Sequence, residues 1–597
     1  MSEGEDKVLA AGDSTELSRS DRLPDWFPSW AGELAELYFS GTTNVFLLHG
    51  NTFDFVRTTA KGTSFGSISD FLSQQLFGRW DLVLHYDLAR GLRCVAGSSA
   101  ERLREMVALA NRRVGDLSKI PKDPSKTLMV LDRFLQKNVM AKPQDRLSVG
   151  IVIDHASFVV PRGDRISLQE KTHLVTLLNW ATSPYLKRLN MCVALLEDQQ
   201  SNVSERLVGN PHVASIEVSL PKEADRLAYL EAVAGKKIES VSDYTIEEIA
   251  KLTAGIALAD LNVLVQSALE ADERLDSATF QKLKKRLIER QARGLLEFIE
   301  PSWGLDMVVG HDAAKERLRQ DALLLKKGRL ESVPMGYLFC GPVGTGKSFL
   351  AQCATGSIGI PCVKLKNFRS KYVGETEGNL ERVLGVLRSM GPVVVIVDEA
   401  DAMLGDRQGS GGDSGVNSRI FGMIAQQMGD TRYRGKILWM LLTARPDLLP
   451  IDIKRQGRAE VHVPLFYPTE ESELKKLFLV LAKKSGATLR EENVPTEIQH
   501  KGNLSGADIE GIIGRAWRIS LIADSEEITK EALAEALEGF LPSSQSLERE
   551  LQELAAIIEC TDIDFLPAAK LARMKELGGR EHVQERLTAV KQIVENR

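Results

Sequence analysis

Residues 341–348 read GPVGTGKS, and this match to G-x-x-x-x-G-K-[ST] constrains the 597-residue chain more than any other feature. An apolar run, residues 337–340, precedes it, so we expect a strand, a glycine-rich loop and then a helix. In such a loop backbone N–H groups surround phosphate oxygens, and side chains would block that approach. We expect Lys347 to reach the β- and γ-phosphates and Ser348 to bind Mg²⁺. The predicted phosphate-binding residues are Gly341, Pro342, Val343, Gly344, Thr345, Gly346, Lys347 and Ser348.

A second feature follows about fifty residues later. Residues 393–397 (VVVIV) form an uninterrupted apolar run, which is typical of a parallel strand buried on both faces. Asp398 and Glu399 come directly after it, at the end of the strand where ligands bind in open α/β sheets. We expect Asp398 to hold Mg²⁺ and Glu399 to polarise the attacking water. The alternative is a strand that ends in a solvated acidic turn.

Four further motifs carry a family resemblance. They are SKYVGETE at 370–377, TARPDLL at 443–449, RQGR at 455–458 and LSGADI at 504–509. With the two sites above, they make residues 304–540 resemble the AAA family, which includes valosin-containing protein, katanin and the FtsH ATPase domain. The resemblance implies an α/β domain with a parallel sheet and a helical lid, ATP and Mg²⁺ as ligands, and a ring of subunits, normally a hexamer.

The resemblance also implies roles for individual residues. Tyr372 and Val373 fall in the family's substrate-gripping pore loop, and Arg455 and Arg458 match its paired arginine fingers, which reach the nucleotide of a neighbouring subunit. An arginine finger stabilises charge on the transferring phosphoryl group. The adenine would lie between the pairs Val309–Gly310 and Gly506–Ala507. For the arginines, the alternative is surface solubility.

One position departs from the family. Its first-sensor residue is usually an asparagine, which helps to orient the attacking water, whereas this chain has Ala444. Thr443 is adjacent, but neighbouring side chains on a strand point to opposite faces. The sequence therefore predicts ATP binding with slow hydrolysis.

The N-terminal half reads as a degenerate copy of the same module. Residues 44–50 (NVFLLHG) parallel the strand that leads into Gly341, but no lysine follows. Residues 149–156 (VGIVIDHA) parallel 393–400, with His155 in place of Glu399, and residues 191–196 and 253–261 parallel the later strand and the start of the lid. The fold class predicted is α/β, with two AAA-type modules, of which the first lacks catalytic groups and stabilises the ring or binds a partner.

Composition narrows the function classes. The net charge of −6 and the pI near 6.0 argue against a nucleic-acid partner. Six scattered cysteines form no C-x-x-C pair, the N-terminus lacks the pattern of a signal peptide, and no apolar run is long enough to span a bilayer. We therefore expect a cytoplasmic protein without membrane contact. The sequence contains no H-E-x-x-H, which excludes a fused protease of the FtsH kind.

We predict six segments. They are a flexible acidic N-terminus (1–25), a degenerate AAA α/β domain (26–221), a helical lid and linker (222–300), an active AAA ATPase domain (301–466), its helical lid (467–540) and a C-terminal helical tail (541–597). Arg286, the run 294–298 and the inactive first half give a looser likeness to a plastid and cyanobacterial AAA family.

Two functions compete at this stage. In the first, an AAA ATPase remodels or unfolds a protein client as a ring. In the second, the protein is a nucleotide-gated regulatory scaffold with slow turnover, which Ala444 and the degenerate first module favour.

Overall fold

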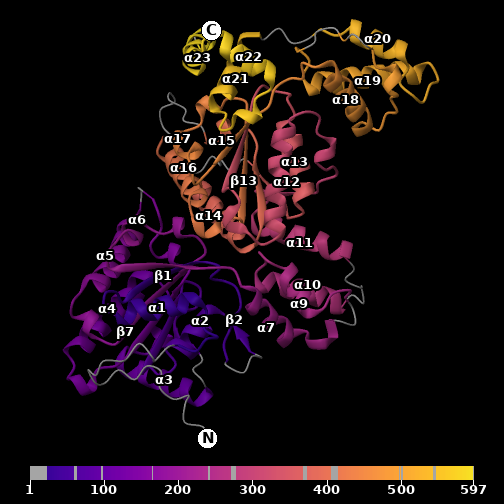
Figure 1. Cartoon of the computed structure of the whole chain (residues 1–597). Coiled ribbons are helices and arrows are strands. Elements are labelled where there is room, and N and C mark those ends of the chain that lie inside the picture. The colour runs from indigo at the N-terminus through magenta and orange to yellow at the C-terminus, as the bar shows by residue number, and fades with distance from the viewer. Residues whose placement is uncertain are drawn as a thin grey trace. The chain divides into compact units, whose positions relative to one another are not determined.

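The computed structural model describes residues 23–59, 64–95, 99–163, 166–238, 242–270, 277–366, 373–404, 414–495, 498, 502–541 and 546–595. The chain divides into two compact units. The first comprises the described parts of 1–293 and 369–390, and the second those of 294–368 and 391–597. Figure 1 labels their elements. No helix among these residues has the length and apolar character needed to cross a bilayer.

The first unit is built on a six-stranded sheet with the order β5-β4-β6-β7-β1-β8. All neighbours run parallel except β4 and β5. Alternate residues of β1 belong to two different hydrophobic clusters, one on each face, because successive side chains of a strand point to opposite sides. The strands are β1 (Val45–Gly50), β4 (Leu82–Asp87), β5 (Gly91–Cys94), β6 (Val149–Asp154), β7 (Met191–Glu197) and β8 (Val213–Val218), with a separate hairpin of β2 (Val56–Arg57) and β3 (Phe65–Gly66).

Helices cover this sheet and then form a smaller helical group. Those of the sheet domain are α1 (Ser29–Phe39), α2 (Ile68–Phe71) with the π-turn Leu72–Leu76, α3 (Ala100–Arg113), α4 (Pro124–Met140), α5 (Leu168–Thr182) and α6 (Glu205–Val208). The later group is α7 (Glu223–Val233), α9 (Ile246–Leu252), α10 (Leu258–Glu270) and α11 (Ser277–Gln291). These helices fall within the segment 222–300, for which a helical lid and linker is predicted.

The second unit contains a sheet with the order β14-β10-β13-β12-β11-β9. Its strands are β9 (Leu296–Ile299), β10 (Gly336–Cys340), β11 (Cys362–Leu365), β12 (Val393–Val397), β13 (Ile437–Thr443) and β14 (Val461–Pro464). Only the pair β9–β11 is antiparallel. When the second sheet is read from β9 to β14, its strand order matches that of the first sheet read from β5 to β8. This match confirms the prediction of two α/β modules.

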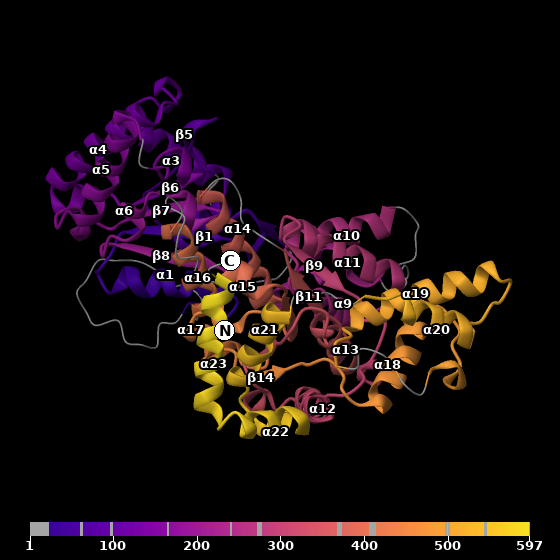
Figure 2. The ribbon, with the colours of Figure 1, turned by 90° about the horizontal axis from the view of Figure 1, so that it is seen from above.

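The lid and the tail of the second unit form two separate helical groups, as the views in Figures 1 and 2 agree. The lid contains α18 (Glu471–Lys484), α19 (Gly506–Ile522) and α20 (Lys530–Glu538), which share one apolar cluster. The tail contains α21 (Ser546–Glu559), α22 (Ala568–Glu576) and α23 (Arg580–Glu595). The sheet domain holds α12 (Asp312–Lys326), α13 (Lys347–Ile358), α15 (Ala400–Leu404), α16 (Ser414–Met428) and α17 (Ile451–Lys454).

Two features differ from the predicted boundaries. Residues 296–299, expected in a helical linker, form β9 and pair with β11, so the second unit begins at Gly294. Helix α14 (Val373–Ser389), expected inside the segment 301–466, is grouped with the first unit. Both differences depend on pairing between distant segments, which local sequence patterns do not encode. Residues 1–22 of the predicted N-terminal segment lie outside the described residues.

Candidate nucleotide site

The glycine-rich loop joins β10 to α13, as the sequence predicts. Gly344 and Gly346 have φ of +81° and +85°, a backbone region that side chains disfavour. A Cβ atom on Gly341 would lie 2.0 Å from the carbonyl oxygen of Leu465, which no other residue could tolerate. Helix α13 begins at Lys347, so its N-terminal amides face the loop.

Lys347 folds back over the loop. Its Nζ donates hydrogen bonds to the carbonyl oxygens of Gly341 and Pro342, both at 2.8 Å. Burial lowers the pKa of the Lys347 ammonium to about 8. The ammonium is therefore partly desolvated and placed where phosphate groups would replace the two carbonyls as its partners.

The acidic residues after β12 lie against the same loop. The Oγ atom of Ser348 is 3.4 Å from each carboxylate oxygen of Asp398, and the exposed Glu399 lines the same cavity. Glu399 has φ of +50°, a strained conformation for a residue with a side chain. Its backbone N–H donates to Oδ1 of Asp398 at 3.1 Å, so the turn helps to hold the Asp398 carboxylate.

The segment after β13 closes the inner wall of the cavity. Thr443 and Ala444 both line it. The Thr443 hydroxyl donates to Asp401 at 2.6 Å and accepts from the backbone N–H of Arg445 at 2.9 Å. The hydroxyl is thus engaged by its own neighbours, and Ala444 contributes no polar group.

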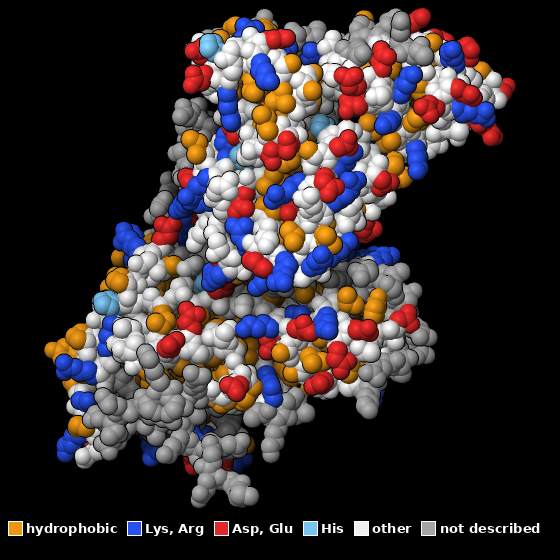
Figure 3. Space-filling view, in the orientation of Figure 1, with side chains coloured by type: hydrophobic (Ala, Val, Ile, Leu, Met, Phe, Trp, Pro, Cys, Tyr) orange, Lys and Arg blue, Asp and Glu red, His pale blue; other side chains and the backbone are white. Residues whose placement is uncertain are grey.

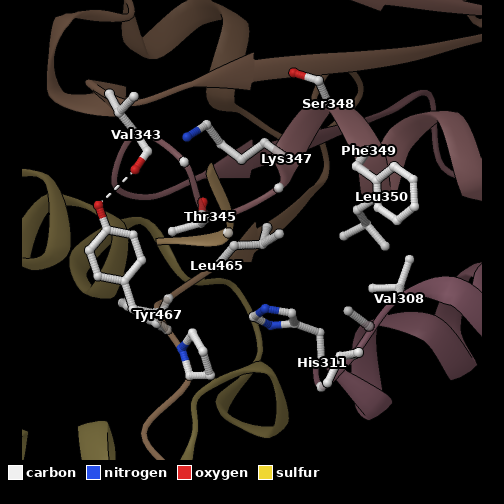
Figure 4. A pocket seen from close by; sticks show the side chains of 18 of the residues that line it. Val308, His311, Val343, Thr345, Lys347, Ser348, Phe349, Leu350, Leu465 and Tyr467 are labelled. Carbon is white, nitrogen blue, oxygen red and sulfur yellow. Dashed lines mark hydrogen bonds between the residues drawn. The ribbon is translucent and has the colours of Figure 1, made fainter. Parts of the chain in front are cut away.

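The lid contributes both apolar and charged side chains to the cavity wall, the charged ones including Glu473, Lys484 and Glu510. Val309, Gly310, Gly506 and Ala507 all line the cavity, together with Leu477 and Leu481 of α18. The backbone N–H of Gly506 donates to the carbonyl oxygen of Gly344 at 2.9 Å, which joins the lid to the loop. The cavity measures about 970 Å³, and Figure 4 shows Lys347, Ser348, His311 and Tyr467 around it. Desolvation lowers the pKa of His311 to about 4, so its ring is neutral near pH 7.

These residues fit ATP and Mg²⁺ by the chemistry of their donors. The loop offers amides, a cation and glycine backbone without Cβ atoms, which suits phosphates. A hydroxyl and a carboxylate are the hard oxygen ligands that Mg²⁺ prefers. Ser348 and Asp398 would hold the metal, and it would neutralise charge on the β- and γ-phosphates.

Family models match three segments of the chain. Residues 20–219 match the N-terminal Rossmann-like domain of an AAA+ chaperone, residues 224–293 its second helical domain, and residues 337–467 the ATPase family associated with various cellular activities. The chain belongs to the AAA family.

Individual AAA relatives are distant. The chain is 26% identical over 376 residues to the cell division cycle protein 48 homolog of Archaeoglobus fulgidus, covering 55% of this chain and 50% of that protein. It is 27% identical over 232 residues to the vesicular-fusion protein sec18 of Schizosaccharomyces pombe (37% and 29%). It is 28% identical over 221 residues to the ATP-dependent zinc metalloprotease FtsH 2 of Salinibacter ruber (35% and 32%). The chain thus spans half or less of the length of these relatives.

The paired arginines of this AAA chain lie away from its own cavity. Among the described residues that line the cavity, neither Arg455 nor Arg458 occurs. The Arg455 side chain is 59% exposed and lies 3.5 Å from Asp452. Arg458 donates to the Asp452 carbonyl oxygen at 2.7 Å. Tyr372 lies outside the described residues, and Val373 is the first residue of α14.

The corresponding edge of the first AAA module keeps the backbone of a nucleotide site. Gly50 has φ of +99°, and a Cβ there would lie 2.7 Å from the carbonyl oxygen of Val218, just as Gly341 meets Leu465. His155 has φ of +54°, close to the +50° of Glu399. The turn is retained, but the carboxylate that would activate water is replaced by an imidazole that stacks on Phe53.

In the first module, side chains of the chain bond to the groups at this edge of the sheet. Asp54, which is 5% exposed, accepts hydrogen bonds from the backbone N–H groups of Leu258 and Ala259 at 2.9 and 2.8 Å. It therefore caps α10, which corresponds in the first module to α19, the helix that lines the nucleotide cavity in the second. By strand register Asp198 corresponds to Ala444, and it accepts a hydrogen bond from Arg382 of α14 at 2.7 Å.

Some site residues were not predicted from sequence. Lys364 of β11 lies 2.7 Å from Asp398, Tyr467 donates to the Val343 carbonyl oxygen at 2.7 Å, and Gln552 accepts from the Val343 N–H at 3.1 Å. In the sequence, the only sign that the tail packs against something is its apolar periodicity, which includes Leu551 and Leu554. Nothing local identifies what it packs on.

Proposed function

We propose that the second module binds ATP with Mg²⁺ and hydrolyses it. One observation carries this proposal: Lys347, Ser348, Asp398 and Glu399, which come from separate parts of the chain, line one cavity of about 970 Å³. Apolar residues such as Val309, Leu477 and Leu481 line part of the same cavity, where they could contact a base. The family models and the relatives, among them the ATP-dependent zinc metalloprotease of Salinibacter ruber, support the same reaction.

The residues divide between binding and chemistry. Lys347 and the amides of residues 344–348 hold the phosphates, while Ser348 and Asp398 hold the metal. Glu399, exposed on the cavity wall, accepts the proton of the attacking water. A bound Mg²⁺ would supply positive charge beside the phosphates, and Ser348 and Asp398 would hold it there.

Two variants test this assignment. Lys347→Ala should abolish binding of a fluorescent ATP analogue, because the cation that meets the phosphates is removed. Glu399→Gln should bind the analogue as tightly as the wild type but hydrolyse ATP at least 100-fold more slowly. His155→Gln, the matched change in the first module, should leave both quantities unaltered. Nucleotide binding by Lys347→Ala with wild-type affinity would refute the site.

We further propose that the protein forms a homo-oligomeric ring of six subunits, the number that the family resemblance implies. In this proposal ATP hydrolysis drives the ring to remodel or unfold a protein client. The exposure of Arg455 outside its own cavity supports a finger that acts on a neighbouring subunit. The AAA+ chaperone models that match the first half support a protein client. Tyr372 of the pore loop would grip that client, so Tyr372→Ala should lose client processing while basal ATPase activity stays.

A second candidate function is a nucleotide-gated scaffold with slow turnover. Ala444 favours it, since the residue at the sensor position contributes no polar side chain to the cavity. In that case Tyr372→Ala would leave function intact, and assembly state rather than turnover would follow ATP. For either function we propose a cytoplasmic protein without membrane or nucleic-acid partners. On the face shown in Figure 3 basic and acidic side chains are interspersed, and this supports a protein partner over nucleic acid.

A further inference from the structure

The C-terminal tail lies beyond every segment that the family models match, yet it is packed into the second unit. Leu551, Leu554, Ala555 and Ala556 of α21 are at most 2% exposed. Residues of the tail, among them Gln552 and Lys570, line the nucleotide cavity itself. The tail is thus part of the wall of the site.

Its most direct contact is with the phosphate-binding loop. Gln552, which is 6% exposed, accepts the backbone N–H of Val343 on its Oε1 atom at 3.1 Å. On the other side of the same residue, the Tyr467 hydroxyl donates to the Val343 carbonyl oxygen at 2.7 Å, as Figure 4 shows. The Arg549 guanidinium of α21 lies 5.7 Å from the centre of the Tyr467 ring. Both backbone groups of Val343 are therefore held by side chains that the tail supplies or supports.

The tail also contacts the segments that carry the candidate arginine finger Arg455 and the sensor position Ala444. Glu559 forms an ion pair with Lys454, which directly precedes Arg455. Lys591 of α23 lies 3.1 Å from Asp447, which follows the sensor position Ala444 by three residues. Glu559 and Asp447 are mostly buried, so these pairs are less screened than surface pairs.

We propose that Gln552 is a positioning residue of the nucleotide site and that docking of the C-terminal tail is coupled to nucleotide binding. The proposal rests on ATP binding by the second module. A loop of three glycines has many conformations, and holding Val343 at both its N–H and its C=O removes part of that freedom before the phosphates arrive. By reciprocity, a nucleotide that orders the loop favours the docked tail.

The test compares two substitutions of similar size in the full-length chain. Gln552→Met keeps the volume but offers no acceptor to the Val343 N–H, whereas Gln552→Glu keeps an acceptor oxygen. We expect Gln552→Met to weaken binding of a fluorescent ATP analogue about 2- to 13-fold, the equivalent of one neutral hydrogen bond. In steady-state assays KM for ATP should rise by a similar factor with kcat nearly unchanged. Gln552→Glu should retain more of the affinity, and Gln584→Ala, at an exposed position of α23, is the control.

Hydrogen–deuterium exchange gives a readout that does not depend on turnover. In the nucleotide-free protein, Gln552→Met should speed exchange in peptides that contain Val343. Nucleotide should protect residues 546–595 in the wild type and protect them less in Gln552→Met. Wild-type affinity and exchange in Gln552→Met would overturn the proposal, and so would equal losses in the Met and Glu variants, because packing alone would then explain them. Failure of the wild type to bind the analogue would instead refute ATP binding, and the coupling with it.

Discussion

Lys364 and Asp398 are joined across neighbouring strands, with the Lys364 Nζ atom 2.7 Å from Oδ2 of Asp398. The first module repeats the arrangement. His85 is at the register position equivalent to Lys364, and its Nε2 atom lies 2.8 Å from Asp154, the counterpart of Asp398. In both modules a basic side chain on the adjacent strand thus faces the aspartate that ends the central apolar strand.

This pair predicts a competition between Lys364 and Mg²⁺ for Asp398. Lys364→Met should lower the Mg²⁺ concentration needed for half-maximal nucleotide binding, because a competing cation is removed. The Lys364 side chain is 38% exposed, so the pair is worth at most about 1 kcal/mol and the change should be no more than about 5-fold. A Mg²⁺ titration at fixed fluorescent nucleotide measures it. Lys366→Met, which removes a pair with Glu297, is the control. A raised Mg²⁺ requirement would show that Lys364 assists the metal.

Ala444→Asn should raise kcat more than it changes ATP affinity. The Thr443 hydroxyl already donates to Asp401, so an amide at 444 would add the missing polar group. One hydrogen bond to a charged group in the transition state is worth about 1.5–3 kcal/mol, or roughly 10- to 150-fold in rate. Single-turnover hydrolysis isolates this step from product release. Ala444→Val controls for added volume, and a fall in rate for the Asn variant would argue against the missing-sensor explanation.

Arg455→Ala and Arg458→Ala should each bind ATP normally and hydrolyse it poorly, since neither side chain lines the cavity of its own chain. If the fingers act between subunits, mixing either variant with Lys347→Ala should restore part of the ATPase activity. The two defects would then lie on opposite sides of one interface. ATPase assays over a range of mixing ratios decide this. Absence of rescue at every ratio would favour a site complete within one chain.

Asp54→Ala should loosen the lid of the first module. The carboxylate caps α10 at two amides, and loss of such a cap costs about 0.5–2 kcal/mol. Exchange of the amides in the first turn of α10 should therefore speed up by roughly 2- to 30-fold. Asp54→Asn, which retains one acceptor oxygen, should have a smaller effect. Nucleotide affinity of the second module should not change; a large change would mean that the first module acts on the site.

Acid should weaken docking of the tail through Glu559 and Asp447. Burial alone would raise both pKa values, but His462 and Lys454 beside Glu559, and Arg445 and Lys591 beside Asp447, bring them below their ordinary values. A carboxyl whose folded-state pKa is lowered stabilises the fold above its unfolded pKa, and this contribution is lost as pH falls through the folded pKa.

The test is the difference in unfolding temperature between the wild type and Glu559→Gln. It should be largest near pH 7 and shrink as pH falls below about 4, where the wild-type carboxyl also becomes neutral. Glu581→Gln, at an exposed position of α23, should change the unfolding temperature little at any pH. A difference that persists unchanged to pH 3 would mean that the charge of Glu559 does not hold the tail.

Local sequence patterns predict the parts of this protein whose chemistry depends on neighbouring residues. A phosphate loop needs glycines, a lysine and a hydroxyl at fixed spacing, and residues 341–348 carry all of them. The buried strand before Asp398 and Glu399 was visible because a strand covered on both faces must be apolar throughout. The same local patterns revealed the degenerate copy, and the positive φ values of His155 and Glu399 show that its turn survived the loss of chemistry.

The groups that complete each site from distant parts of the chain are known from the folded structure alone. Gln552 is 209 residues from the loop amide that it accepts, and Asp54 is 204 residues from the helix that it caps. Strand β9 pairs with β11 across more than sixty residues of chain, and α14 is grouped with the first unit rather than with the strands that flank it. Each of these contacts forms between segments that are far apart in the sequence and that the fold brings together. The periodicity of a segment specifies that it is buried, but not the partner against which it is buried.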